Sequence, residues 1–224
     1  MKDIAIFLFS KSKIIAKPWA DNGIECHLFD LQLESGREGN YVFHGGDIRK
    51  RRKQLGKLCR NNNVVIVGCF SPCTDLSISG TRHFESKALN NSMFWAEAMG
   101  LFWHGIFLAD FFDIPYFCEQ PKSMVTTLHG KPDFKFHPNE FGGYLPDDHQ
   151  HCLYPEIYPS QDAYKKDTWI WYGNGFVPPT KKPVEPASTD NPGWKSLGGK
   201  SERTKEIRSV TPEGYSVALF QSNY

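Results

Sequence analysis

The chain has 224 residues, of which 40% are hydrophobic and 14% aromatic, enough for one sizeable core but short for two independent domains. Its 26 basic and 25 acidic residues give a formal net charge of +1, so any contact with a polyanion must be local. No apolar segment has the length of a membrane span, and no signal peptide is evident. The six cysteines lack a paired spacing, so we expect reduced thiols in a cytoplasm. From the length we expect a single domain over residues 1–224.

The first thirty residues predict a strand, a helix and a second strand. An apolar strand is expected over residues 4–9 and a helix over 14–22, with Gly23 just past the helix end. The next apolar run, residues 24–29, predicts a strand that ends at Asp30. Such a βαβ order implies a parallel sheet with right-handed crossovers. An acid at the tip of the second strand is suited to hydrogen-bond the ribose of an adenosine-containing ligand, so Asp30 is a candidate cofactor-binding residue.

A short strand over residues 41–44 is followed by Asp47 and then by five consecutive basic residues, 49–53. Asp47 has the side chain of a helix N-cap. The basic run continues with Lys57 and Arg60. Such a run is either a solvated helix face or a surface that meets a phosphate backbone, and both interpretations remain open.

A run of β-branched residues from Val64 to Val67 predicts a strand buried on both faces. Ser71, Pro72 and Cys73 follow it, at the edge of the sheet where open α/β folds bind ligands. Because Pro72 fixes its own φ and restricts the residue before it, the thiol is expected on a stiff turn. Polar residues and glycine follow, a composition that stays near water. Cys73 is therefore a candidate nucleophile, the alternative being a small buried hydrophobe.

The second half of the chain continues the same layered pattern. Apolar residues at helical spacing predict a long helix over residues 92–112. A strand over 114–118 then ends in Glu119-Gln120-Pro121, and a strand over 169–172 is expected to close the sheet in the antiparallel direction. Thr211-Pro212 predicts the start of a terminal helix. The fold class is therefore α/β, a Rossmann-like three-layer sandwich with a mostly parallel sheet.

Two stretches show little periodicity. Residues 122–167 form an expected loop-rich insertion of the kind that signals function, and residues 177–200 an expected flexible loop. The insertion contains His149, His151 and Cys152, which have ligand chemistry for a metal, but no repeated paired spacing supports one and no metal site is assigned.

The segment Pro72-Cys73-Thr74-Asp75-Leu76-Ser77, closed by Gly80, resembles the proline-cysteine nucleophile loop of cytosine-5 DNA methyltransferases. It is even more similar to the small methyltransferase-like proteins common in bacteriophage genomes, with loops that read Pro-Pro-Cys-Thr-x-Leu-x-x-Ser-Gly. Glu119-Gln120-Pro121 stands where the family has Glu-Asn-Pro or Glu-Asn-Val. Arg208-Ser209-Val210-Thr211-Pro212 matches a family block that precedes the last helix. The resemblance covers most of the chain.

The resemblance implies an enzyme that transfers a methyl group from S-adenosylmethionine to cytosine in DNA or in a nucleotide. Cys73 would add to carbon 6 of the base, and Glu119 would hold and protonate ring nitrogen N3. The cofactor-binding residues would be Phe9, Ser10, Asp30, Asp47, Ser71 and Pro72, with Asp47 at the adenine amino group. Candidate substrate-binding residues are Ser77, Gln120, Arg203 and Arg208.

One departure from the family pattern keeps two alternatives open. The family's first loop is rich in glycine, whereas residues 9–14 contain none, and two lysines in this loop would suit an anionic ligand. The first alternative is a degenerate relative that binds DNA or a nucleotide without methyl transfer. The second is a pyrimidine-modifying transferase that keeps the cysteine chemistry but uses another donor.

Overall fold

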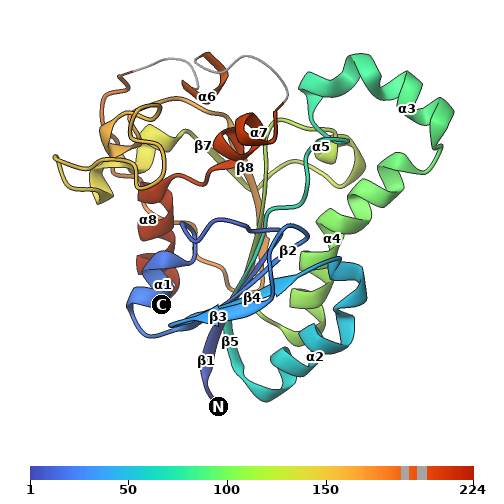
Figure 1. The fold of residues 1–224 in the computed structure, drawn as a ribbon, viewed down its shortest axis with the longest axis horizontal. Helices are drawn as coiled ribbons and strands as arrows, with labels where there is room; N and C mark the ends of the chain where they lie inside the picture. Colours follow the sequence, from blue (N-terminus) through green and yellow to red (C-terminus); the bar gives the residue numbers. More distant parts are fainter. Residues whose placement is uncertain (188–191, 196–200) are drawn as a thin grey trace. The chain divides into compact units, whose positions relative to one another are not determined.

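The computed structural model describes residues 1–187, 192–195 and 201–224, and the chain divides into two compact units (Figure 1). The first unit consists of Met1–Lys11, Trp19–Lys135 and Trp169–Phe176. The second consists of Ser12–Pro18, Phe136–Thr168 and Val177–Tyr224. The expected insertion over 122–167 is thus shared between them. Part of the expected loop over 177–200, residues 188–191 and 196–200, lies outside the described residues.

One eight-stranded sheet has the order β3-β4-β2-β1-β5-β6-β8-β7. Its strands are β1 (Asp3–Leu8), β2 (Glu25–Asp30), β3 (Gly36–Glu38), β4 (Tyr41–Gly45), β5 (Asn63–Cys69), β6 (Tyr116–Gln120), β7 (Phe134–Phe136) and β8 (Thr168–Gly173). Strands β4, β2, β1, β5 and β6 pair in parallel, whereas β3 and β8 pair antiparallel with β4 and β6. The predicted α/β class with a mostly parallel sheet is confirmed, as is the antiparallel direction of β8.

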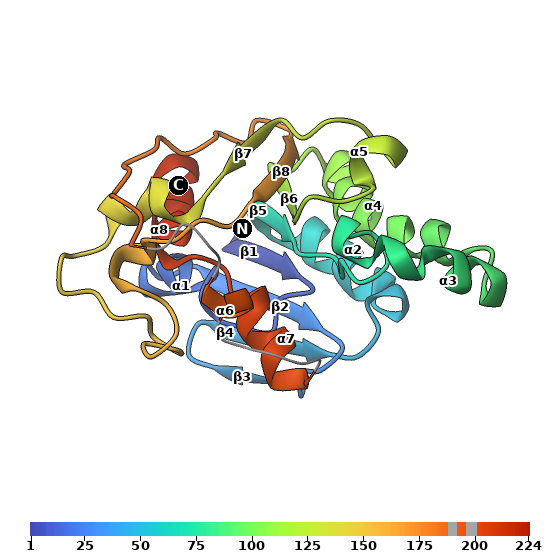
Figure 2. The same cartoon turned by 90° about the horizontal axis from the view of Figure 1, so that it is seen from above.

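Helices of the first unit cover both faces of the sheet (Figures 1 and 2). The helices of this unit are α1 (Lys17–Asp21, shared with the second unit), α2 (Arg52–Asn61), α3 (Phe84–Asn90), α4 (Phe94–Phe112) and α5 (Val125–Leu128), with 3₁₀ turns η1 (Ile48–Lys50) and η2 (Ile78–His83). Helix α3 has no buried residue and projects away from the sheet. Residues of α2 and α4 join the same core cluster as β1 and β5, including Leu55, Phe102 and Leu8. On the other face Trp19 of α1 packs near Phe7, with ring centroids 6.5 Å apart.

Several element boundaries differ by one to three residues from those predicted, and two of the differences bear on the argument. The first helix begins at Lys17 rather than at residue 14, because Pro18 lacks an N–H and fits only the first turn of a helix. Strand β6 runs two residues further than expected and ends at Gln120, so Glu119 is a strand residue paired with Ile170 of β8. The helix predicted over 92–112 is confirmed as α4. Strands β3 and β7 are short and helix α3 has no buried residue, so the apolar pattern indicated none of them.

The second unit is built from loops, 3₁₀ turns η3 (Pro138–Tyr144) and η4 (Ser160–Asp162), and helices α6 (Pro192–Lys195), α7 (Glu202–Ser209) and α8 (Glu213–Asn223). The terminal helix predicted after Pro212 is confirmed as α8. It begins in close contact with η3, since a Cβ on Gly214 would clash with the Phe141 carbonyl oxygen, so glycine is required there. The buried carboxyl of Asp162 accepts the Gly214 N–H at 2.8 Å, and burial raises its pKa to about 7.

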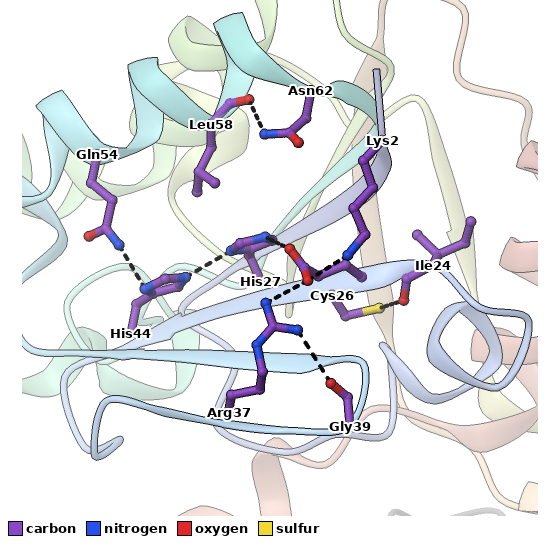
Figure 3. A network of polar contacts seen from close by, with 11 residues as sticks. Lys2, Ile24, Cys26, His27, Arg37, Gly39, His44, Gln54, Leu58 and Asn62 are labelled. Carbon is purple, nitrogen blue, oxygen red and sulfur yellow. Dashed lines mark hydrogen bonds and ion pairs between the residues drawn. The ribbon is translucent and has the colours of Figure 1, made fainter.

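A chain of polar side chains crosses the interior of the first unit beneath α2 (Figure 3). The amide of Gln54 lies 2.8 Å from Nδ1 of His44, and Nε2 of His44 lies 2.9 Å from Nδ1 of His27. Nε2 of His27 is 3.0 Å from a carboxylate oxygen of Glu25. Both imidazoles and the carboxylate are buried. Each of these buried side chains therefore needs a matching hydrogen-bond donor or acceptor on its neighbour.

The charged groups around Glu25 fix the direction of the hydrogen bonds between these side chains. Lys2 and Arg37 donate to Glu25 at 2.8 and 2.6 Å. Burial alone would raise the pKa of Glu25, but these hydrogen bonds outweigh it and lower the pKa to about 2. An ionised Glu25 can only accept, so His27 donates from Nε2 and accepts at Nδ1, and His44 does the same. Burial lowers the pKa of both imidazoles, that of His44 to about 4, which agrees with two neutral rings.

We predict that the free energy of unfolding falls as the pH is lowered from about 7 to about 4.5, and falls less in a His44→Gln variant. Unfolded histidine binds a proton near pH 6.5, whereas folded His44 resists protonation down to about pH 4, so acid favours the unfolded chain. Urea unfolding at several pH values measures both proteins. The glutamine amide can replace the two hydrogen bonds, and all other titrating groups are shared. Equal pH dependence in the two proteins would contradict a neutral, buried His44.

Candidate functional site

Five loops that carry predicted site residues meet at one edge of the sheet. Because β1, β2, β4, β5 and β6 are parallel, the residues that follow them all leave the sheet at its carboxyl edge. From β1 the chain adds β2 and β4 on one side of the sheet, and from β5 it adds β6 and β8 on the other. Open α/β sheets bind ligands at the point where the order reverses in this way, which here lies between β1 and β5. The loops after β1 and β5 flank that point. They hold Ser10 and Cys73.

The loop after β5 holds Cys73 in a tight turn. Its carbonyl accepts the N–H groups of Leu76 at 3.0 Å and Ser77 at 2.8 Å. Leu76 is fully buried in the main core, which fixes the end of the turn. On the outer side, Lys87 of α3 donates to the carbonyl of Thr74 at 3.0 Å and to the Asp75 carboxylate at 2.6 Å. Cys73 itself is half-buried and is not one of the four buried cysteines, so its thiol is not sealed in the core.

The end of β6 is attached to this same loop by a buried side chain. Nε2 of Gln120 donates to the hydroxyl of Ser71 at 2.8 Å and also to the Ser71 carbonyl. Gln120 is 1% exposed and Ser71 is 4% exposed, so these hydrogen bonds are shielded from water. Successive residues of a strand point to opposite faces, so Glu119 points away from the face that holds Gln120. Glu119 is half-buried.

The two segments continue side by side beyond that link. The N–H of Met124 donates to the Leu76 carbonyl at 2.8 Å, and the N–H of Ile78 donates to the Lys122 carbonyl at 3.2 Å. Ser77 and Ser123 form an antiparallel bridge between them. The register upstream is equally close, since Cys69 of β5 pairs with Cys118 of β6. Residues 71–78 and 119–124 therefore form one hydrogen-bonded structure, which brings the loop of Cys73 to the strand end that carries Glu119.

The loop after β1 has an unusual backbone at Phe9. Its φ is +58°, in the left-handed region that glycine adopts most readily. The N–H of the next residue, Ser10, donates to the Phe29 carbonyl at 3.2 Å, which ties the loop to the end of β2. Ser10 is buried. The backbone thus enters the left-handed region at one residue without glycine, while side chains occupy the loop in which glycine would let a ligand approach the backbone closely.

The two acids predicted to bind the cofactor lie at neighbouring strand ends. Asp30 pairs in register with Gly45 of β4, and one of its carboxylate oxygens accepts the N–H of Gln32 at 2.8 Å. Asp47 caps η1 by accepting the N–H of Arg49, as expected of an N-cap. The Arg49 guanidinium also binds both oxygens of Asp47, and these hydrogen bonds lower the pKa of Asp47 to about 2. An adenine bound at Asp47 would share the carboxylate with Arg49.

The remaining predicted residues fall into different surroundings. Pro72 is exposed beside Cys73, and the Ser77 hydroxyl lies 2.8 Å from that of Ser79. Gln120, a candidate for substrate contact, is buried between the two loops. Arg203 and Arg208 lie on α7 in the second unit.

The second unit holds a cluster around the first residue of α8. Ligand atoms of His151, Cys152 and Glu213 lie within 4.8 Å of one another, and Nε2 of His149 lies 3.4 Å from Glu213. Nδ1 of His149 accepts the backbone N–H of Gln161, and Nδ1 of His151 accepts two backbone N–H groups. Burial and the Glu213 charge raise the pKa of Cys152 to about 12. The cluster therefore organises the loop, and we assign no metal to it.

Several of these residues were not predicted as site residues. Glu213 was missed because nothing in the sequence links it to residues sixty positions earlier. Glu25 and His27 carry a local signal, since they alternate with apolar residues in β2, but the sequence pattern assigns them no partner. Lys87 lies on α3, which has no buried residue, so no apolar periodicity in the sequence indicates its hydrogen bonds to the Cys73 loop.

Sequence comparison gives no match to a model of a known protein family, and no match to a curated protein. Among the described residues, no helix combines the length and apolar character needed to cross a bilayer.

We predict that Gln120→Leu lowers the free energy of unfolding by about 1–3 kcal/mol, because the buried hydroxyl and carbonyl of Ser71 lose their donor. Gln32→Leu, at an exposed position of the same unit, is the matched control and should change stability by less than about 0.5 kcal/mol. Urea unfolding measures both variants. Equal stability of the two would mean that Gln120 does not hold the loop.

Proposed function

We propose that this protein is a cytosine-5 methyltransferase-like enzyme of Rossmann-like fold that modifies cytosine in DNA through a covalent adduct at Cys73. The observation that carries the proposal is the hydrogen-bonded pairing of residues 71–78 with 119–124, which joins the loop of Cys73 to the strand end of Glu119. The resemblance of both segments to family motifs supports the same assignment.

The chemistry needs a thiol and a carboxylic acid on opposite sides of one pyrimidine ring. The Cys73 thiolate forms a bond to carbon 6, which moves electron density onto carbon 5 and the ring nitrogens. Glu119 donates a proton toward N3 and so neutralises the charge as it develops. After carbon 5 has gained the methyl group, it loses its proton to water and the bond from sulfur to carbon 6 breaks to restore the thiolate. N3 then returns its proton to Glu119, which is again a carboxylic acid.

S-adenosylmethionine, when bound, would supply the methyl group. The turn at Phe9 and the carboxylate of Asp30 would hold its amino-acid and ribose parts, and Asp47 would face the adenine. Ser71 is buried against Gln120, so its contribution would be to fix the backbone of the loop. A base inside a duplex is out of reach of both side chains, so a DNA target would be flipped from the helix. A free cytosine nucleotide would need no flipping.

We predict that Cys73→Ala reduces methyl transfer from labelled S-adenosylmethionine to duplex DNA by about a thousandfold or more. Glu119→Gln, which keeps the shape of the side chain but removes the acid, should reduce it by about 10² to 10⁴. Cys152→Ser removes an exposed thiol in the second unit and is the matched control, with activity unchanged. A Cys73→Ala protein that still methylates DNA would refute the assigned nucleophile.

Calorimetry with S-adenosylmethionine separates the proposal from its two alternatives. Binding that is weakened by Asp30→Ala supports a methyl donor at this edge. Absence of binding would leave either a protein that binds DNA or a nucleotide without transfer, or a transferase that uses another donor.

A further inference from the structure

A stripe of cations runs along the outer face of α2. Lys53, Lys57 and Arg60 stand at i, i+4 and i+7, so they share one side of the helix. All three are exposed, whereas Leu55 and Cys59 on the opposite side are buried in the core. We call Lys53, Lys57 and Arg60 the α2 stripe.

The cations of the α2 stripe have no acidic ion-pair partner in the part of the chain that the structure describes. Among the described residues, no carboxylate forms an ion pair with the neighbouring Lys50 and Arg52 either. Two other basic residues of the same run are engaged. Arg49 pairs with Asp47, and Arg51 donates to the Gly45 carbonyl. The sequence of α2 contains no acid. In a chain of net charge +1, this is a local concentration of positive charge.

The shape of the α2 stripe favours a linear polyanion. Seven residues of helix span roughly 10 Å, so the three cations form a line and do not converge on one small anion. A helix that lies on a membrane needs an exposed apolar face, but the buried side of α2 packs against the sheet. The helix also begins at the carboxyl edge, because only η1 separates it from the end of β4. A strand of nucleic acid at that edge would have its phosphates within reach of the first cations.

We propose that the α2 stripe binds the phosphate backbone of DNA. The choice of DNA rests on the proposed function, while the surface is an addition to it, because the methyl-transfer chemistry makes no use of α2. Contacts of this kind are independent of sequence and position the nucleic acid for base-specific contacts elsewhere. They also release counterions, so their number can be counted from the salt dependence of binding.

The test measures binding of the full chain to a short mixed-sequence DNA duplex by fluorescence anisotropy over a range of salt concentrations. The variant Lys53→Gln/Lys57→Gln/Arg60→Gln should bind about tenfold or more weakly at about 0.1 M salt. Its slope of log K against log salt should be shallower by about 0.9 for each charge removed. Glutamine is a good helix former, and the sites are exposed, so α2 should persist, which circular dichroism checks.

The matched control is Lys131→Gln/Lys165→Gln/Lys205→Gln, which removes the same charge from exposed positions on other elements. Its affinity should stay within about twofold of the wild type. An equal loss in both triple variants would show a net-charge effect and overturn the proposal, as would no loss in either. Binding through the α2 stripe to vesicles of anionic phospholipid, with no binding to DNA, would overturn it in favour of a membrane surface.

The result is separable from that for methyl transfer. Repeating the binding measurement in a Cys73→Ala background removes the chemistry and leaves the α2 stripe intact. Weaker DNA binding by the α2 triple variant without any methyl transfer by the wild type would refute only the enzymatic proposal. Methyl transfer that depends on Cys73, with unchanged salt dependence in the α2 triple variant, would refute only the α2 stripe.

Discussion

The hydrogen bonds from Gln120 to Ser71 connect the two segments on which the proposed chemistry depends. Parallel strands bring many loops to one edge of a sheet, but they do not fix the distance between loops. Here a buried amide at the end of β6 holds the loop after β5, and the backbone pairing of residues 76–78 with 122–124 extends the link. Because buried polar groups are costly to leave without partners, this junction resists separation. Cys73 lies two residues after Ser71, and Glu119 lies immediately before Gln120.

The sequence was sufficient to predict the longer strands of the sheet and its mostly parallel character. Apolar runs such as residues 64–67, the alternation of strands with helices, and the start of a helix at Pro212 all act locally, and the structure agrees with them. The same patterns placed Asp30 and Cys73 at strand ends. Boundaries were less predictable, because the pairing of β6 with β8 lengthens the strand to Gln120 and draws Glu119 into the sheet.

Long-range polar contacts were not predictable from the sequence. Gln120 was expected to touch substrate, but the partner that buries it, Ser71, lies 49 residues earlier in the chain. The chain from Glu25 through His27 and His44 to Gln54 joins two strands and a helix, and no local pattern reports such a pairing. In the second unit the contacts of Glu213 and Asp162 depend on how loops fold back around α8. In each case the energetics arise from burial, which only the tertiary structure defines.

Helix α2 links the interior of the first unit to its surface. Its inner side chain Gln54 completes the chain of neutral imidazoles, while its outer side chains form the α2 stripe, so the position of the cations depends on the buried hydrogen bonds beneath them. The acidic and basic groups of the protein are thus used in two ways. Some, such as Glu25 with Lys2 and Arg37, form ion pairs with one another, and others have no acidic partner among the described residues and remain available to an anionic partner.

The most direct measurement is the mass of the protein after incubation with S-adenosylmethionine and a DNA duplex that contains 5-fluorocytosine. Fluorine at carbon 5 cannot leave as a proton does, so the bond between sulfur and carbon 6 cannot break after methyl transfer and the adduct persists. We expect a covalent complex of protein and DNA strand that peptide mapping assigns to Cys73. An adduct at another cysteine, or none in a protein that binds both DNA and S-adenosylmethionine, would contradict the role of Cys73 and Glu119.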